Sequence, residues 1–177
     1  MPSLVGSEMC IRDRGKPMGN GIPISGLAAK EDVLAAFSDK LPYFNTFGGN
    51  PVSIAAAQAV LKYIKDENLQ EHCKKAGAAL LKALKEVQER HPESVGDVRG
   101  AGLFLGFEFV KNDGNKTPDK DMALNVIEML RDEHILTSVI GHYGNILKLR
   151  PPMVFSENDI DWFATSLDKC ITKLENK

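Results

Sequence analysis

The chain has 177 residues, of which 43% are hydrophobic and 26% are charged, and its net charge at pH 7 is −2. This composition is that of a globular protein with a core of its own, and no apolar run approaches the roughly 20 residues that span a bilayer. The near-zero charge gives no electrostatic case for a nucleic-acid or membrane partner, and without a targeting signal we expect a cytoplasmic protein by default.

The first fourteen residues, MPSLVGSEMCIRDR, have no signal-peptide or transit-peptide character. Within them, LVGSEMCIRDR is what one reading frame of a common transposon-type sequencing adapter encodes. We therefore expect residues 1–14 to be a non-native, disordered segment, with a genuine disordered N-terminus as the alternative. Cys10 would then carry no chemistry. The other cysteines, Cys73 and Cys170, form no metal-binding spacing or disulfide framework, which favours a reducing compartment.

Residues 15–67 consist mostly of loops and short elements. A lysine-bearing loop, GKPMGNG, precedes IPISGLAA (22–29), which we expect to be a short buried strand, and KEDVLAAF (30–37), which we expect to be a short helix. A polar, glycine-rich connection then leads into a helix from Pro51 through Ile64. This part needs something else to pack against, which indicates that the chain is a fragment.

Residues 68–177 alternate helices with strands and are expected to form a compact α/β or α+β unit with two or three strands. The elements expected here are a helix capped by Asn68, a strand in 94–110, a helix ending near His134, strands in 134–140 and 145–152, and a helix capped by Ser156, which forms a near capping box with Asp159. Apolar residues three and four positions apart predict the core-facing stripes of the first and last of these helices: Leu69, Cys73, Ala76, Leu80, Leu84 and Val87, and Ile160, Phe163, Leu167, Ile171 and Leu174.

Two segments of the first part could carry chemistry. Lys16 lies between glycine and proline, and its amine becomes a nucleophile for Schiff-base formation if burial or a nearby cation lowers its pKa. The alternative is an ordinary solvated lysine. In YFNTFGGNP, Thr46 and Gly48 precede a helix, where a hydroxyl and backbone N–H groups can bind phosphate. The alternative is an ordinary turn with Asn50 as the N-cap.

Two segments of the second part are also candidates. Arg99 is followed by glycines that let a strand approach a ligand or another backbone; the alternative is an arginine that bonds carboxyl or carbonyl groups. Lys148 and Arg150 lie on one face of a strand that stops at Pro-Pro, and together they could bind one anion. The alternative is a solvated edge strand protected by its charges.

In this order, GKPMGNG, YFNTFGGNP, DVRGAGLFLG and LKLRPPM closely resemble the C-terminal portion of class III aminotransferases, which are pyridoxal-phosphate enzymes of fold type I. The resemblance runs from Gly15 to the last helix. It implies an α/β fold in which residues 15–67 end the large cofactor-binding domain and residues 68–177 form the small C-terminal domain.

The resemblance also implies roles for single residues. Lys16 would hold the cofactor as an internal aldimine and move the substrate proton, and Thr46, with Gly48, would reach the cofactor phosphate of the neighbouring subunit in a homodimer. Lys148 stands where an arginine commonly grips the substrate α-carboxylate, with Arg150 close by. No metal is implied. The family's large domain precedes the lysine, so we expect the 177-residue chain alone to be inactive and to bind cofactor poorly.

The same segments look most like the phospho-lyases that eliminate phosphate from phosphoethanolamine or phosphohydroxylysine. A lysine at position 148 suits an anionic phosphate substrate, whereas Ile22 stands where these relatives usually carry histidine. The sequence therefore predicts a transaminase acting on a small-molecule amine or amino acid. A phospho-lyase and a non-catalytic α/β binding or dimerisation module are the alternatives.

Overall fold

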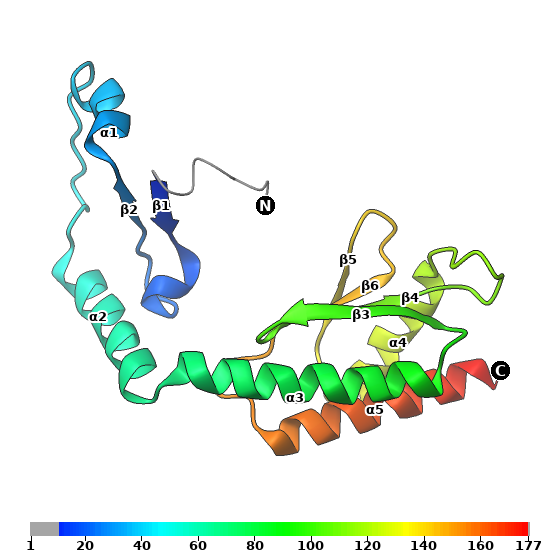
Figure 1. Cartoon of the computed structure of the whole chain (residues 1–177). Coiled ribbons are helices and arrows are strands. Elements are labelled where there is room, and N and C mark those ends of the chain that lie inside the picture. The colour runs from blue at the N-terminus through cyan, green and yellow to red at the C-terminus, as the bar shows by residue number, and fades with distance from the viewer. Residues whose placement is uncertain (1–10, 177) are drawn as a thin grey trace. The chain divides into compact units, whose positions relative to one another are not determined.

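The computed structural model describes residues 11–176, and the chain divides into two units between Glu67 and Asn68 (Figure 1). Most of the expected adapter-derived segment, including Cys10, lies outside the described residues. None of the helices in the described range is long and apolar enough to cross a membrane.

The first unit begins with two paired strands. Strand β1 (Ile11–Arg14) pairs antiparallel with β2 (Gly26–Ala29). Residues up to Arg14 were expected to be disordered, but residues 11–14 form this strand. Strand pairing needs only backbone N–H and C=O groups, which nearly every sequence supplies. The expected burial of the second strand is also wrong. Leu27 of β2 is 63% exposed, because the hydrophobic cluster of the described residues lies entirely in the second unit.

Two helices complete the first unit. Helix α1 (Glu31–Ser38) has two acidic residues in its first turn, as its sequence predicts. Helix α2 (Pro51–Asp66) begins at the predicted proline and runs two residues beyond Ile64. None of the residues of α2 is buried in the described chain. The described part of the first unit therefore has regular elements but no buried hydrophobic cluster, in agreement with the expectation that it needs something else to pack against.

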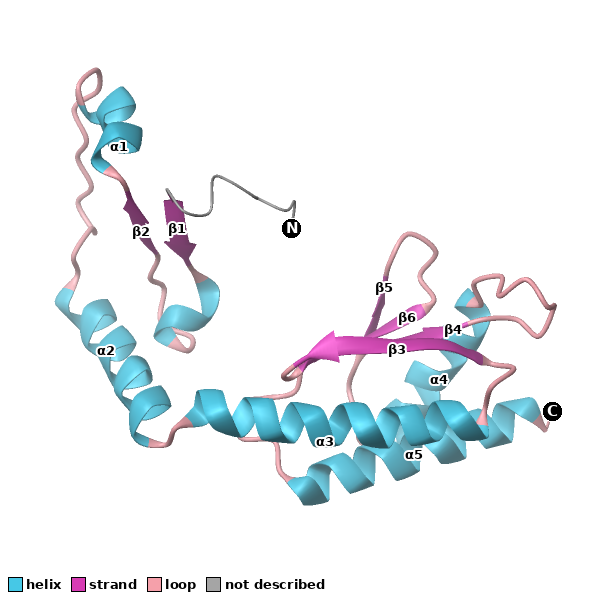
Figure 2. Cartoon of the chain, viewed as in Figure 1, coloured by secondary structure: helices cyan, strands magenta, loops and turns pink. Residues whose placement is uncertain are grey.

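The second unit is a four-stranded antiparallel sheet with three helices (Figure 2). The strand order is β3-β4-β6-β5. The elements are α3 (Leu69–Arg90), β3 (Val95–Ala101), β4 (Phe104–Phe109), α4 (Lys120–Asp132), β5 (Ser138–Ile140), β6 (Ile146–Leu149) and α5 (Glu157–Glu175). Alternate residues of β4 and β6 are buried under the helices, so the opposite face of the sheet, here called the open face, carries their other side chains.

The segment expected to form one strand over 94–110 forms two, because the chain reverses at Gly102. Gly102 has φ +53°, a left-handed conformation that glycine adopts at little cost. A Cβ atom built on Gly77 of α3 would lie 2.2 Å from the carbonyl oxygen of Gly102. The glycines after Arg99 were predicted to allow the close approach of either a ligand or another backbone. The structure shows the close approach of another backbone.

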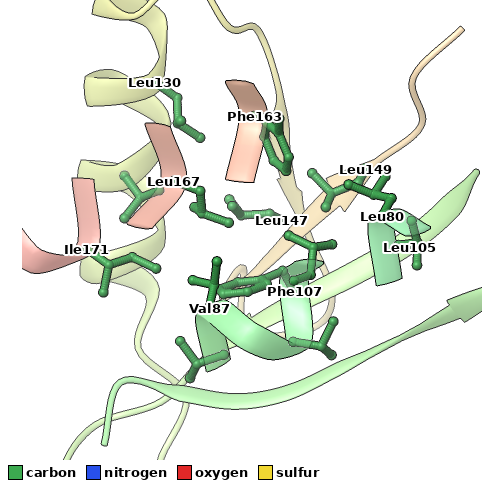
Figure 3. Packing of buried hydrophobic residues seen from close by; sticks show 14 of the residues in the cluster. Leu80, Val87, Leu105, Phe107, Leu130, Leu147, Leu149, Phe163, Leu167 and Ile171 are labelled. Atoms are coloured by element: carbon green, nitrogen blue, oxygen red, sulfur yellow. The ribbon is translucent and has the colours of Figure 1, made fainter. Parts of the chain in front are cut away.

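The core of the second unit lies between the sheet and the helices (Figure 3). The predicted stripes of α3 and α5 supply much of it, together with inward residues of β4 and β6. The central members are Leu80, Leu84, Val87, Leu105, Phe107, Phe109, Leu147, Leu149, Phe163, Leu167 and Ile171. Periodicity therefore predicted the buried faces of both helices correctly.

Two helix starts show different capping chemistry. At α5, Ser156 and Asp159 form the predicted capping box, with each side chain bonded to the other's backbone N–H. At α3, the predicted N-cap Asn68 precedes the first helical residue but makes no side-chain cap bond. Its φ of +48° puts it in the left-handed region, which asparagine tolerates better than most residues. The predicted start of the helix was therefore correct, but the predicted cap bond from the Asn68 side chain was wrong.

A polar cluster around the buried His91 joins the end of α3 to α5. His91 is only 6% exposed; its Nδ1 lies 2.7 Å from Glu175 Oε2 and its Nε2 lies 3.0 Å from Asp168 Oδ1. Arg90 donates to the same Asp168 oxygen at 2.8 Å. Burial raises the pKa of Asp168, but the hydrogen bonds from Arg90 and His91 outweigh it and leave the pKa below its ordinary value.

This lowered pKa predicts an acid-sensitive link between the helices. A carboxylate with a depressed folded-state pKa contributes stability above its unfolded value of about 3.9, and loses it as the pH falls through the folded value. In urea unfolding, we expect Asp168→Asn to lower the midpoint at pH 7, and the difference from the wild type to shrink toward pH 3. The exposed Asp161→Asn is the matched control. A difference that stays constant with pH would contradict the prediction.

Candidate functional site

Lys16 begins a short ordered turn rather than an open loop. Residues Lys16–Gly19 form a 3-10 helix, η1, with Pro17 in its first turn, and Met18 N donates to Gly15 O at 2.8 Å. Asn20 closes the turn in a left-handed conformation, with φ +47°. The backbone of η1 lies against α2 within the first unit. The backbone at Lys16 is therefore held at a defined place. The structure does not describe the side chain of Lys16.

Thr46 lies in the turn that leads into α2. Asn45 Oδ1 accepts hydrogen bonds from the N–H groups of Phe47, at 3.1 Å, and Gly48, at 3.0 Å. Asn50 Oδ1 accepts from the N–H groups of the first turn of α2, as the alternative predicted. The N–H of Gly48 is thus already engaged in the turn, whereas Thr46 is exposed beside the N-terminus of the helix.

Lys148 and Arg150 lie together on the open face of the second unit. They alternate with Leu147 and Leu149, which are buried, so both side chains leave the sheet on the side away from the helices. Strand β6 lies between β4 and β5, so it is not an edge strand. The sequence alternative of charges that protect a sheet edge is therefore wrong, since interior strands need no such protection.

Arg99 is on the same face, but two carboxylates neutralise it. Its Nη1 lies 2.6 Å from Asp97 Oδ2 and 2.6 Å from Glu108 Oε2. The hydrogen bond to Glu108, followed by that to Asp97, raises the pKa of the Arg99 guanidinium above its ordinary value. The predicted alternative of an arginine that bonds carboxyl groups is confirmed. Arg99 therefore adds little free positive charge to the open face.

Arg150 has a different neighbour. Its Cζ lies over the ring of Phe104, 5.6 Å from the centroid. Lys148 and Arg150 also line a cavity of about 530 Å³ at the end of β6. Leu80 of α3 and Trp162 and Phe163 of α5 line it too, so the cavity extends to the helix-covered side of the sheet. This volume is within the range of small-molecule sites. The sequence analysis missed Phe104, which lies against Arg150, because only the register of β4 with β6 brings the two together. It also missed Ser138 and Trp162, because only the strand register and the path of α5 bring them to the cavity.

The chain after Arg150 is anchored to α3. His72 Nε2 lies 3.0 Å from the carbonyl oxygen of Phe155, and Cys73 Sγ donates to the carbonyl oxygen of Met153 at 3.7 Å. Burial raises the pKa of the Cys73 thiol, which keeps it protonated at neutral pH. The structure thus brings Lys148 and Arg150 together in the second unit. Lys16, Thr46 and Gly48 belong to the first.

The sequence matches a known family along most of its length. The pattern of the family Aminotransferase class-III matches residues 9–171. "Ethanolamine-phosphate phospho-lyase homolog 1" of Caenorhabditis elegans is 45% identical over 159 residues, which are 89% of this chain and 34% of the relative. "Alanine--glyoxylate aminotransferase 2-like" of Drosophila melanogaster is 40% identical over 159 residues, which are 89% of this chain and 32% of the relative.

Solved structures give the same result for the fold. A phospholyase from Arthrobacter in complex with phosphoethanolamine superimposes with a TM-score of 0.86 at 37% identity, over 92% of this chain and 38% of the other. A transaminase from the marine bacterium Virgibacillus gives 0.83 at 27% identity, over 94% and 39%. The α/β fold is therefore that of these enzymes, and the chain spans about a third of the length of the curated relatives it matches.

Proposed function

We propose that this chain, which belongs to the class III aminotransferase family, is the C-terminal portion of a pyridoxal-phosphate enzyme that acts on a small anionic amine. The family depends on pyridoxal phosphate in general. Because the chain spans about a third of its relatives, the activity of the whole protein belongs to the proposal. The family match favours this over the non-catalytic module that the sequence left open.

The donor groups of the first unit fit this cofactor. Pyridoxal phosphate carries an aldehyde, which condenses with a primary amine, and a phosphate, which accepts hydrogen bonds from hydroxyl and N–H groups. Lys16 supplies the amine at the start of an ordered turn. Thr46 supplies an exposed hydroxyl in the turn that leads into α2, and the dipole of that helix favours an anion near its N-terminus. When bound, the cofactor accepts electrons from the substrate carbon beside the amine.

The roles of the residues follow from these groups. Lys16 would hold the cofactor through its amine, and the same amine would move a proton at the substrate carbon. Thr46 would bind the cofactor phosphate across the interface of a homodimer, an arrangement that the family resemblance implies. Gly48, whose N–H is engaged by Asn45, would shape the turn that presents Thr46. Lys148 and Arg150 bind the anionic group of the substrate.

One observation carries the choice of substrate. Lys148 of the interior strand β6 and Arg150, the residue after that strand, share the open face, and among the described residues neither forms an ion pair with a carboxylate. Two adjacent cations suit a phosphate, which carries more charge than a carboxylate. The Arthrobacter relative was solved with phosphoethanolamine bound. We therefore favour phosphate elimination from a phosphoethanolamine-like amine, with transamination second because other relatives are named aminotransferases.

The assay that separates these activities uses the longest protein encoded around this segment, supplied with pyridoxal phosphate. We expect inorganic phosphate, acetaldehyde and ammonia to be released from phosphoethanolamine and water. Transfer of the amino group from alanine to glyoxylate, without phosphate release, would instead establish the aminotransferase. Neither reaction in a protein shown to hold the cofactor would contradict the proposed substrates.

Removal of either cation should weaken binding of phosphoethanolamine. A charge-assisted hydrogen bond contributes about 1.5–3 kcal/mol, so we expect Lys148→Ala and Arg150→Ala each to raise the dissociation constant about tenfold or more. NMR titration of the 177-residue chain measures this directly. Lys85→Ala removes an exposed lysine on α3 and is the control. Equal affinities in all four proteins would contradict the assignment of the anion site.

A further inference from the structure

The open face contains two arginines with opposite surroundings. Arg99 is held by two carboxylates, each 2.6 Å away, and its charge is compensated. Arg150 has no ion pair within the described residues; its partner is the neutral ring of Phe104, 5.6 Å from the guanidinium carbon. A neutral partner holds a guanidinium in place and leaves its positive charge available to a ligand.

Phe104 has no evident role in the core. It is the first residue of β4 and is 57% exposed, and it lies outside the buried cluster that contains Leu105, Phe107 and Phe109. Its position follows from the register. Leu105 pairs with Leu149, so the preceding residue of β4 comes opposite Arg150, the residue that follows β6. A large exposed ring at this place contributes more to its neighbour on the face than to folding.

We propose that Phe104 is a positioning residue that holds the Arg150 guanidinium for an anionic ligand. An aromatic face attracts the delocalised cation, while the N–H donors of a guanidinium point outward in its own plane. The ring therefore restricts the side chain without occupying its donors. Restricting a long side chain before binding lowers the entropy lost when the ligand is bound. The ligand class is the phosphorylated amine of the proposed function, on which this inference rests.

The backbone around Arg150 supports the same conclusion. Two prolines follow it and fix their φ angles, and Phe155 N donates to Pro152 O at 3.0 Å. The bond from His72 to the Phe155 carbonyl then ties this segment to α3. With the main chain held, the side-chain torsions are the main freedom left to Arg150. The Phe104 ring restricts that freedom.

The test compares Phe104→Leu with Phe104→Tyr in the 177-residue chain. Leucine keeps an apolar side chain but removes the π face, whereas tyrosine keeps the ring. We expect phosphoethanolamine to bind about two- to fivefold more weakly to the leucine variant and with wild-type affinity to the tyrosine variant. Inorganic phosphate should show the same pattern. The Arg150 side-chain N–H signal should lose its ring-current shift in the leucine variant alone.

Arg150→Ala separates this inference from the proposed function. If Arg150→Ala weakens binding while Phe104→Leu does not, the anion site stands and the positioning role of Phe104 is overturned. If Arg150→Ala has no effect, both are overturned. If Phe104→Leu adds no further loss in the Arg150→Ala background, Phe104 acts through Arg150, as proposed. Circular dichroism checks that each variant is folded.

Discussion

We expect Lys16→Ala to abolish the covalent attachment of pyridoxal phosphate to this chain, which is the largest effect expected of any single substitution. The cofactor aldehyde requires an unprotonated primary amine, and alanine offers none. The ordered turn of η1 holds the backbone of Lys16 at one place, so other lysines are not expected to substitute for it. Borohydride reduction after incubation with the cofactor, followed by peptide mass spectrometry, locates the attached group.

Lys30→Ala is the matched control for this experiment. Lys30 is an exposed lysine of the same unit that immediately precedes α1. We expect the control to retain the attachment on Lys16. Because the chain spans about a third of its relatives, we expect attachment to the chain alone to need excess cofactor. Labelling spread evenly over many lysines, and unchanged in Lys16→Ala, would count against the role of Lys16.

Gly77→Val should strongly destabilise the second unit. A Cβ atom at position 77 would lie 2.2 Å from the carbonyl oxygen of Gly102, so α3 must move away from the turn between β3 and β4. Overpacking of this kind costs about 1–3 kcal/mol, and more when backbone must move. We expect a lower urea midpoint for unfolding, or no folded protein.

Ala78→Val provides the comparison for that change. Residue 78 is the next position of α3 and is exposed, so valine there meets solvent and costs only its lower helix propensity. We expect a loss of well under 1 kcal/mol in this control. If the two variants lose the same stability, helix propensity alone explains the effect, and the close contact between Gly77 and Gly102 has no energetic importance.

Local pattern was a reliable guide where a single element decides the outcome. The stripes of α3 and α5 were visible from apolar residues that recur every three or four positions, and their buried members form the core. The capping box at Ser156 was visible because its two residues are three positions apart and interact within one helical turn. Interactions between residues a few positions apart can be predicted from the sequence, because all the participating groups lie in one segment.

Partners from distant segments were not visible in the sequence. Arg99 was known as an arginine before glycines, but its bond to Glu108 depends on the reversal that separates β3 from β4. Phe104 and Arg150 are brought together by the register of β4 with β6, which no local pattern contains. The exposure of β2 likewise depends on which surfaces lie against it.

The sequence by itself determined the family and the residue types of the proposed site. Lys16, Thr46, Lys148 and Arg150 follow from motifs whose amine, hydroxyl and cationic groups have chemistry of their own. Only the tertiary structure decided which charges are available. Arg99 is neutralised by two carboxylates and Arg150 is held by a neutral ring, although both are arginines on one face. The physical reason is that the usable charge of a side chain depends on its neighbours in space, and strand pairing sets those neighbours.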